Sequence, residues 1–430
     1  MFQLRSVNPV NILITSAWFF ACAFCVWKFS LFRFNGLKQW MVVLFFALKV
    51  FAGGVYVWIH LKYYGGGDTY HYFNDGLIVS SALQHGDWKS WFILCFSASG
   101  THHILPYTDQ MSFWWDRGSY LLVRFHAILN PLTHSSYMAQ LVIYNFLTLA
   151  GISLLWNFLY QFSTEKKWWL VAAFCFPSVI YWTAGVHKDG IILCALGMIL
   201  WSWHQLSVRR FWFGYFILFG FGCFLIFTAR SYLFVILVPL LTGYWLAMWR
   251  PGITIAAFLT TTVLFYVALF NLYRIAPAYN VMEILSWKQL EFFDLNHTHT
   301  NLPVNRLQST VVSLGAHIPQ ALDHCLFRPL PGELTNNLQI PDVVLNLLLL
   351  LFLLFALIRS KIPKGPHLAL LLMLVFYALS VFILSGSIVQ NLGALVRYKM
   401  TGVFALLCAG VILMREFAPK EKLIESSEKK

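Results

Sequence analysis

The stretch FWFGYFILFGFGCFLIFTARSYLFVILVPLLTGYWLAMW, from Phe211 to Trp249, holds one charged residue, Arg230, among apolar and aromatic side chains. A helix that crosses the hydrocarbon layer of a membrane needs about 20 apolar residues, so this stretch predicts two such helices, Phe211–Ala229 and Tyr232–Trp249. The rest of the chain is similar, since 59% of its 430 residues are hydrophobic and 11% are charged. A soluble domain carries about 25% charged residues. The composition therefore excludes a soluble, disordered, collagen-like or disulfide-rich protein and predicts an all-α, polytopic membrane protein.

Nine further apolar runs bring the predicted number of membrane helices to about eleven. Helices are required because backbone polar groups in lipid must form hydrogen bonds within their own segment. We therefore expect a single integral membrane domain over residues 1–430. The nine runs are Val10–Leu31, Trp40–Leu61, Tyr137–Tyr160, Trp168–Ala184, Gly190–Leu206, Ile253–Leu272, Val343–Ile358, His367–Ser385 and Leu395–Met414.

Basic residues are concentrated in five short loops and in the C-terminal tail, residues 415–430. If the helices alternate, these six segments all lie on one side, and an excess of Lys and Arg marks the cytoplasmic side. We therefore predict an N-terminus outside and a cytoplasmic C-terminus. The first apolar run lacks a basic n-region, so we interpret it as a retained helix and not as a signal peptide. The loop residues are Arg33, Lys38, Lys166, Lys167, Arg209, Arg210, Arg250, Arg359, Lys361 and Lys364.

Two long segments, residues 62–136 and 273–342, then lie outside. In the first, an apolar helical stripe from Leu121 to Leu129 predicts an amphipathic helix along the outer membrane surface, which Asn130–Pro131 should stop. The headgroup level suits the tryptophans of this segment, because aromatic rings prefer that depth. Cys95 and Cys325, in different outer segments, are candidates for a disulfide in an oxidising compartment. The tryptophans are Trp88, Trp91, Trp114 and Trp115.

Polar chemistry is predicted at the outer face, where this topology places 12 of the 17 acidic residues. The clearest motif is Gly65-Gly66-Gly67-Asp68-Thr69-Tyr70-His71, directly after a predicted span. Three glycines permit a tight turn and leave room for a ligand. Asp68 then stands at the edge of the membrane with His71 three residues later. Asp68 is either a helix N-cap or a functional carboxylate, and the two roles are compatible. We interpret Asp75, further along, as structural.

A second motif, Pro177 to Gly190, forms the predicted outer turn between the fourth and fifth spans. Proline loosens a helix, and Gly185 permits a sharp turn. Two interpretations of Lys188 and Asp189, which follow this turn, stay open. In the first, the two residues neutralise each other or Asp189 caps the next helix. In the second, Lys188 binds an anion at the lipid–water boundary.

Three further cations, Arg230, Arg397 and Lys399, are predicted at the same level. Ionisable groups next to hydrocarbon are usually functional or paired. A phosphate or pyrophosphate headgroup would suit them, because a guanidinium binds phosphate oxygens through two parallel hydrogen bonds. The alternative for each residue is snorkelling to ordinary phospholipid. Lys49, inside a predicted span, either snorkels inward or contacts a helix C-terminus or a buried acceptor.

The sequence contains no P-loop, no Gly-x-Ser-x-Gly elbow and no His-Glu-x-x-His motif. The short cytoplasmic loops leave no room for a nucleotide-binding domain. His102-His103 and His297-Thr298-His299 lack the carboxylate or cysteine partners of a typical metal site, so we assign no metal ligand. No cofactor follows from these residues, although a divalent metal remains compatible with them.

The segment Gly66–Tyr70 resembles the matching outer loop of GT-C integral-membrane glycosyltransferases. Those enzymes commonly carry a catalytic acidic residue in the first large outer loop, so the resemblance implies that role for Asp68. The stretches Pro177–Asp189, Phe327–Pro329 and Asn391–Lys399 are similar to multi-spanning proteins of bacterial surface-polysaccharide clusters. One departure is that two predicted spans precede Asp68, where many GT-C enzymes have one.

The resemblance implies an enzyme of the bacterial inner membrane that transfers sugar from a polyprenyl-(pyro)phosphate donor at the outer face. Asp68 would act as the base, with Lys188, Arg230 and Arg397 at the lipid phosphate. The expected partners are the polyprenyl-linked donor and membrane lipids, and not nucleic acid. A polysaccharide polymerase or ligase that uses outer arginines is the alternative, and a lipid-linked sugar flippase is the third. Supporting residues would be His71, Asp189, Arg328 and Lys399.

Overall fold

The computed structural model describes residues 9–100, 107–208, 212–294, 302–334 and 336–414. These residues are almost entirely helical and contain no β-strand apart from one isolated bridge, Ser360 to Met414. The chain forms two compact units. Unit 1 comprises residues 1–158 and 179–235, and unit 2 comprises residues 159–178 and 236–430.

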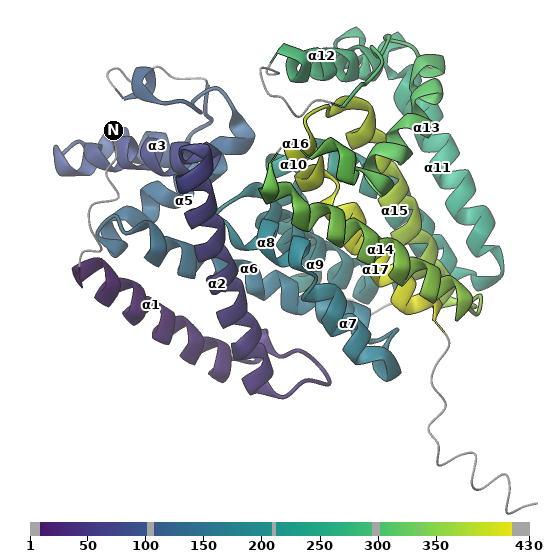
Figure 1. Cartoon of the computed structure of the whole chain (residues 1–430), viewed down its shortest axis with the longest axis horizontal. Helices are drawn as coiled ribbons and strands as arrows, with labels where there is room; N and C mark the ends of the chain where they lie inside the picture. Colours follow the sequence, from purple (N-terminus) through teal and green to yellow (C-terminus); the bar gives the residue numbers. More distant parts are fainter. Residues whose placement is uncertain (1–8, 101–106, 209–211, 295–301, 335, 415–430) are drawn as a thin grey trace, which may run out of the picture. The chain divides into compact units, whose positions relative to one another are not determined.

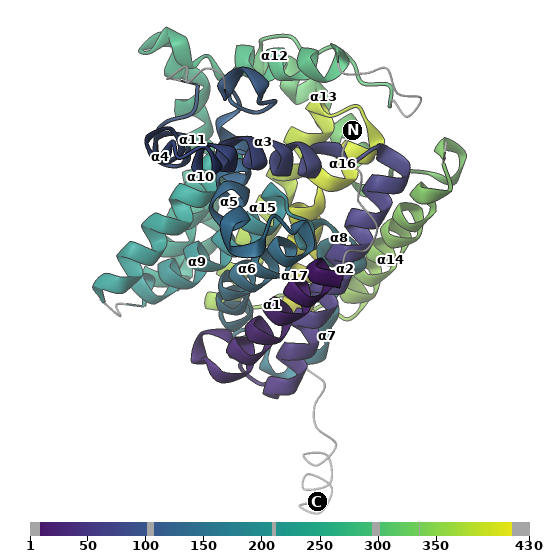
Figure 2. The same cartoon turned by 90° about the vertical axis from the view of Figure 1, so that its left-hand side faces the viewer.

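Unit 1 is built from the first half of the chain (Figure 1). The first two helices pack together as a hairpin, and α3 packs along α5. Figure 2 shows α3, α5 and α6 one below another. The helices of unit 1 are α1 (Pro9–Lys28), α2 (Gln39–Tyr64), α3 (Gly67–Gln84), α4 (Trp88–Phe96), α5 (Arg117–Thr133), α6 (Tyr137–Tyr160, to residue 158), α8 (Pro177–Ala184, from residue 179), α9 (Lys188–Ser207) and the first part of α10 (Phe213–Trp249).

Unit 2 contains the helices of the second half and α7. Within it, α15 packs against both α13 and α17, and α14 packs against α17. Its helices are the last part of α10, α7 (Lys167–Phe174), α11 (Thr254–Asn271), α12 (Val281–Asp294), α13 (Val311–Phe327), α14 (Ile340–Ile358), α15 (Pro366–Ile388), α16 (Leu392–Tyr398) and α17 (Met400–Leu413).

Within the described residues, eight helices are long and apolar enough to cross a membrane, or nine if α16 and α17, bent by 47°, form one span. This agrees with a polytopic membrane protein. The predicted span Trp168–Ala184 consists instead of two eight-residue helices, α7 and α8, because the helix is interrupted just before Pro177. The predicted count of eleven spans and the predicted orientation stay predictions.

The apolar stretch around Arg230 forms a single helical element, α10 (Phe213–Trp249), with one non-helical residue. Arg230 has φ −152° and ψ 90°, so the helix breaks where the two predicted spans meet. At 1.5 Å per residue its 37 residues would extend about 55 Å, well beyond a hydrocarbon layer of about 30 Å. The break at Arg230 therefore agrees with two apolar segments joined at a charged residue.

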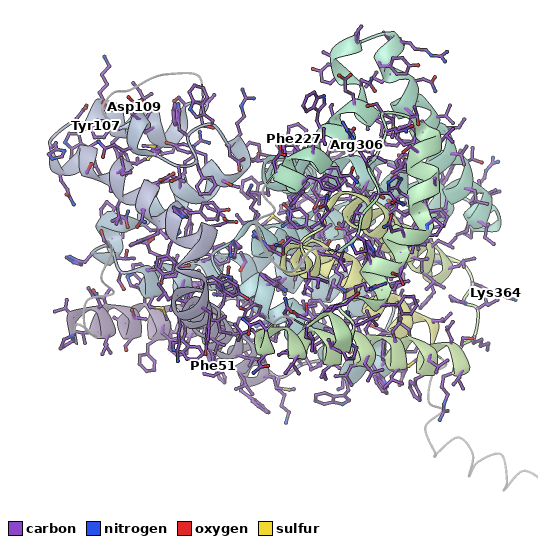
Figure 3. All side chains as sticks on the ribbon, turned by 45° about the horizontal axis from the view of Figure 1, so that its top comes forward. Phe51, Tyr107, Asp109, Phe227, Arg306 and Lys364 are labelled. Carbon is purple, nitrogen blue, oxygen red and sulfur yellow. The ribbon has the colours of Figure 1, made fainter. Side chains whose placement is uncertain are left out.

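Large apolar side chains on the predicted spans are exposed. Phe51 on α2 is 69% exposed and Phe227 on α10 is 57% exposed, as lipid-facing residues would be. Both are labelled in Figure 3. In the first predicted outer segment Trp88 and Trp115 are also exposed, which suits the predicted headgroup position. Trp114 is 1% exposed, so the prediction that it lies among headgroups is wrong.

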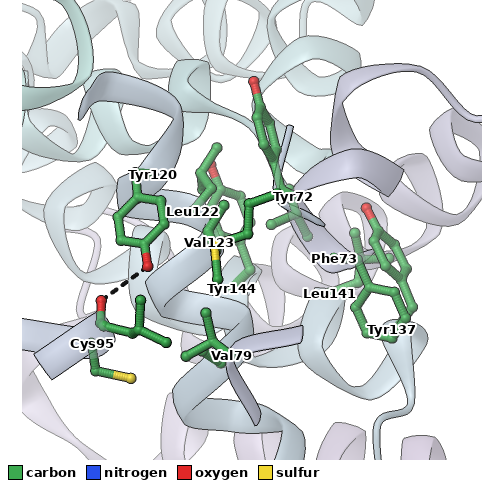
Figure 4. Packing of buried hydrophobic residues seen from close by; sticks show 14 of the residues in the cluster. Tyr72, Phe73, Val79, Cys95, Tyr120, Leu122, Val123, Tyr137, Leu141 and Tyr144 are labelled. Carbon is green, nitrogen blue, oxygen red and sulfur yellow. Dashed lines mark hydrogen bonds between the residues drawn. The ribbon is translucent and has the colours of Figure 1, made fainter. Parts of the chain in front are cut away.

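The core of unit 1 contains a polar network as well as apolar side chains. Figure 4 shows the apolar part, where the Tyr120 hydroxyl donates to the Leu94 carbonyl at 3.1 Å. Beside it, His126 Nδ1 lies 2.5 Å from Gln140 Oε1, and Gln140 Nε2 donates to Asn130 Oδ1 at 2.7 Å. These buried bonds join α5 to α6. Such buried hydrogen bonds favour one arrangement of the two helices, because breaking one leaves a buried polar group unpaired.

Two local predictions meet different outcomes. Helix α5 was expected to stop at Asn130–Pro131, but it continues to Thr133 with Pro131 inside it. It ends where His134 adopts φ 47°, a left-handed conformation that closes the helix.

Lys49 is buried and donates to the carbonyl and hydroxyl oxygens of Thr183, at 3.2 and 3.1 Å. Thr183 lies in the last turn of α8, so the alternative of a helix C-terminus for Lys49 is confirmed.

Candidate functional site

The three-glycine motif forms the turn between α2 and α3. Gly65, Gly66 and Gly67 have φ values of 64°, 113° and 61°, a region that other residues rarely adopt. The Gly66 N–H donates to the His60 carbonyl at 2.9 Å, which closes the end of α2. A side chain at these positions would therefore strain the turn.

Asp68 lies in the first turn of α3, and its side chain is exposed. The N-cap of this helix is Gly66, so the interpretation of Asp68 as the N-cap is wrong. A carboxylate in the first turn is still stabilised by the positive end of the helix dipole. His71, one turn later, is exposed as well.

The two motifs found in the sequence are in contact. Thr69, next to Asp68, donates its hydroxyl to the Val186 carbonyl at 3.3 Å and also bonds the Tyr137 hydroxyl. Thr69 and Val186 are both buried. The beginning of α3 is therefore held against the turn that precedes α9 and Lys188.

This turn is held from two further helices. His187 is 1% exposed, its Nε2 is hydrogen-bonded to the Tyr56 hydroxyl, and its carbonyl accepts from the Tyr144 hydroxyl. Gly185 lies in the bend between α8 and α9, but it does not have a positive φ, so the backbone conformation there does not itself require glycine. A Cβ at Gly185 would instead lie 2.7 Å from the Tyr56 ring. Glycine is therefore required there because Tyr56 packs so closely.

Lys188 pairs with Asp116, which belongs to neither of the two sequence motifs. Its Nζ lies 3.5 Å from Asp116 Oδ2, and the two side chains are 16% and 51% exposed. Asp116 is the N-cap of α5 and accepts from the Gly118 and Ser119 N–H groups at 3.0 and 3.2 Å. A Cβ at Gly118 would lie 3.0 Å from Lys188 Nζ, so glycine leaves the room that the ammonium occupies.

Asp116 is held in its ionised form. Burial by itself would raise the pKa of Asp116, but the Lys188 ammonium and the hydrogen bonds from Ser119 and Gly118 lower it below its ordinary value. The signal for this residue was present in the sequence, because an aspartate directly before an amphipathic helix is a favoured N-cap. Its approach to Lys188 depends on tertiary structure.

Asp189 pairs with Arg230. The distance from Asp189 Oδ1 to Arg230 Nη2 is 2.9 Å, and the side chains are 0% and 6% exposed. The interpretation that Lys188 and Asp189 neutralise each other is therefore wrong, as is Asp189 as the cap, since His187 is the N-cap of α9. This ion pair joins the start of α9 to the break in α10. The geometry gives Arg230 a structural partner, and its predicted contact with phosphate stays a prediction.

The remaining predicted residues belong to unit 2. Lys399 is 2% exposed, and its Nζ donates to the carbonyls of Cys325 and Arg328 at 2.9 and 2.8 Å and to Asn346 Oδ1 at 3.0 Å. An ammonium has three N–H donors, so all three are used within the protein. This arrangement favours a structural role for Lys399.

The other two arginines differ from each other. Arg328 Nε lies 3.1 Å from Asp323 Oδ2, and its guanidinium also pairs with Glu333. Arg397 lies near the end of the short helix α16 and is half-buried. The predicted set is thus divided, with Asp68, His71, Lys188, Asp189 and Arg230 in unit 1 and the other three in unit 2.

Asp75 is structural, as its position suggested. It is 1% exposed and accepts from the N–H groups of Ser112 and Phe113 at 3.1 and 2.8 Å. Burial raises the pKa of Asp75, while these two bonds and the nearby His71 oppose the rise. The segment that leads to Asp116 is thereby fixed to α3.

In the part of the chain that the structure describes, no three His, Cys, Asp or Glu side chains are arranged to hold a metal. His102-His103 and His297-Thr298-His299 lie outside the described residues. Cys95 and Cys325 are free thiols, each buried within its own unit.

No protein-family model, curated protein or solved structure matches this chain.

Proposed function

We propose that this chain is a membrane glycosyltransferase of GT-C type, which transfers sugar from a polyprenyl-(pyro)phosphate donor to an acceptor hydroxyl at the outer face of the bacterial inner membrane. The observation that supports it is the Thr69–Val186 hydrogen bond. This bond holds the exposed carboxylate of Asp68 on a helix start that contacts the turn before Lys188. Asp68 and Lys188, which are distant in the sequence, thus lie on two segments that are in contact.

In the proposed reaction the acceptor oxygen bonds to the anomeric carbon of the donor sugar as the bond from that carbon to the phosphate oxygen breaks. The hydroxyl proton passes to the Asp68 carboxylate, and the phosphate leaves with the bonding electrons. A positioned carboxylate suits this step because a neutral hydroxyl is a poor nucleophile. The resemblance in the Gly66–Tyr70 segment supports the same assignment.

Lys188 is proposed to bind the donor phosphate. Lys188 Nζ lies 3.5 Å from Asp116 Oδ2, where the carboxylate is 51% exposed and the lysine side chain 16% exposed. A donor phosphate that approaches from the exposed carboxylate side would place a second anion beside the ammonium. Arg397, which belongs to unit 2, is proposed separately to bind a lipid phosphate.

The test uses the full-length protein in lipid nanodiscs with a panel of polyprenyl-phosphate-linked and polyprenyl-pyrophosphate-linked radiolabelled sugars. We expect label transfer that requires both Asp68 and Lys188, whereas Asp294→Asn and Lys89→Ala, which change exposed residues, retain it. If no donor in the panel is consumed, or if Asp68→Asn and Lys188→Ala both transfer at the wild-type rate, the proposal is wrong.

A polysaccharide polymerase or ligase is the second candidate, supported by the exposure of Arg274 and Arg306 in unit 2. A transferase adds one sugar per donor consumed, while a polymerase joins whole repeat units. The length of the labelled product on a gel therefore separates the two.

A further inference from the structure

Residues 302–308, in the second predicted outer segment, form neither helix nor strand, and we call them the strap. The strap leads toward α13 and is held within unit 2 mainly by side chains of other elements. Its Leu302 N–H donates to the Gln390 carbonyl at 2.9 Å, and the Gln320 side chain of α13 donates to the Pro303 carbonyl at 2.5 Å. A segment held in this way can open without unfolding a helix.

The middle of the strap is held by α12 and α13 together, two helices that Figure 1 labels. Gln289 of α12 is fully buried, donates to the Asn305 carbonyl at 3.0 Å and accepts the Leu307 N–H at 2.7 Å. From α13, His317 Nε2 lies 3.0 Å from the same Asn305 carbonyl oxygen. A carbonyl oxygen has two lone pairs, so it can accept from both side chains.

His317 has a backbone carbonyl at each of its two ring nitrogens. Its Nδ1 lies 2.6 Å from the Ser313 carbonyl oxygen, one turn earlier on α13, and its Nε2 lies against Asn305. A carbonyl oxygen only accepts hydrogen bonds, whereas a neutral imidazole has one N–H donor and one lone pair. Both contacts are therefore hydrogen bonds only when the ring carries two protons. The residue is 6% exposed, so little water can reach a nitrogen that loses its bond.

The charged state of His317 has no carboxylate partner among the described residues, since none of the ion pairs there includes this ring. On α12 and the strap the charged residues are all exposed. On α13, α14 and α15 none of the titratable residues is hydrogen-bonded to the ring in the part of the chain that the structure describes. The first group is Glu283, Lys288, Glu291, Asp294 and Arg306, and the second is Asp323, His324, Cys325, Asp342, His367 and Tyr377.

Histidine is the side chain whose charge ordinarily changes between pH 5 and 8. A proton that adds a hydrogen bond in the closed strap, and not in the open one, favours the closed strap. We propose that His317 is a pH-sensitive latch. At acidic pH it binds the Ser313 and Asn305 carbonyls at once, and at higher pH it releases one of them and the strap loosens.

The latch would act on a group at the predicted outer face, which meets the pH of the medium. Arg306, labelled in Figure 3, lies on the strap next to Asn305 and is exposed. Acid would therefore hold this arginine in one place, and a higher pH would let it move.

The test is hydrogen–deuterium exchange of the full-length protein in nanodiscs at pH 5.5 and pH 7.5. The reporters are the strap amides of Leu307 and Gln308, which are hydrogen-bonded in the closed state. Protection factors are compared, so the effect of pH on the exchange chemistry itself cancels.

Two variants remove the proton, and either one that folds serves. The amide nitrogen of His317→Gln can replace Nε2 and that of His317→Asn can replace Nδ1, but neither side chain titrates. His324→Gln is the matched control, a buried histidine on the same helix. Gln320→Ala removes a different bond to the strap.

We expect strap protection in wild type to be about tenfold higher at pH 5.5 than at pH 7.5, because one hydrogen bond from a charged donor is gained. The His317 variants should lose this difference, and His324→Gln should keep it. Gln320→Ala should lower protection at both pH values and leave their ratio unchanged. Wild-type protection that does not depend on pH, or an undiminished difference in a folded His317 variant, overturns the latch.

Discussion

Lys188 in unit 1 and Lys399 in unit 2 stand at comparable places in the sequence, each at the start of a helix at the predicted outer face, yet their surroundings differ. Lys188 is 16% exposed and lies 3.5 Å from an exposed carboxylate. Lys399 is 2% exposed and donates to three acceptors at 2.8 to 3.0 Å. All three ammonium donors of Lys399 are used by acceptors within the protein, whereas the carboxylate beside Lys188 is 51% exposed to solvent. The comparison therefore favours Lys188 as the ligand-binding lysine and Lys399 as a structural one.

The same contrast separates the acids of unit 1. Asp189 is fully buried against Arg230, Asp75 is buried against backbone N–H groups, and Asp68 is exposed. We expect the exposed groups to contribute to activity and the buried ones to stability.

The largest effect is expected at Asp68. A general base contributes about 10²–10⁴ in rate, so Asp68→Asn should lose that much turnover while expression and donor binding persist. Asp75→Asn should lower turnover less. The loss of turnover is measured from the initial rates of label transfer by the purified variants. An Asp68→Asn enzyme that turns over at a rate near that of wild type would shift the assignment to the arginine-based polymerase.

Removing a buried partner should instead affect stability. Asp189→Ala leaves the guanidinium of Arg230 buried without its carboxylate, and breaking such a pair costs about 3–5 kcal/mol. Thermal unfolding in nanodiscs should therefore show a large loss of stability for Asp189→Ala and a smaller loss for Asp116→Ala, which removes the N-cap of α5 and costs about 0.5–2 kcal/mol. Equal melting temperatures for the two variants would contradict the distinction between buried and exposed pairs.

Much of this arrangement could be predicted from local sequence. The three glycines before Asp68 predicted a turn, and the single charge in an apolar run predicted the break at Arg230, because both depend on neighbouring residues alone. The partners of Lys188 and Asp189 could not be predicted. Asp116 precedes Lys188 by 72 positions, and only the packing of α5 on the rest of unit 1 brings them together. The close packing of Tyr56 against Gly185 could not be predicted either, because the local sequence indicates only that glycine favours a turn.

Phosphate binding should distinguish two cations of the predicted outer face, Lys188 and Arg397, from Arg359 on the predicted cytoplasmic side. Lys188→Ala and Arg397→Ala should each weaken binding of a polyprenyl phosphate by one to two decades, since a charge-assisted hydrogen bond contributes roughly 1.5–3 kcal/mol. Arg359→Ala should have little effect. Tryptophan fluorescence titration gives the affinities, and Arg397→Lys should recover little if the contact is bidentate. Equal losses in all three alanine variants would count against the site.

The smallest effect concerns the pH dependence of stability, where the two units again differ. Burial lowers the pKa of His126 from its ordinary 6.5 to about 4, against the bond to Gln140, which raises it. The unfolded chain therefore binds more protons than the folded one between pH 6.5 and 4, so stability falls as the pH is lowered through this window. A shift of this size implies a loss of about 2 kcal/mol of folding stability between pH 7 and pH 5.

In unit 2, burial also lowers the pKa of His324, and the Asp323 carboxylate opposes this shift. His126 lies among fully buried groups, so His126→Gln should flatten the pH dependence of the melting temperature more than His324→Gln does. If the His324 variant flattens it more, then the polar network of α5 and α6 is not the dominant acid-sensitive element of the protein.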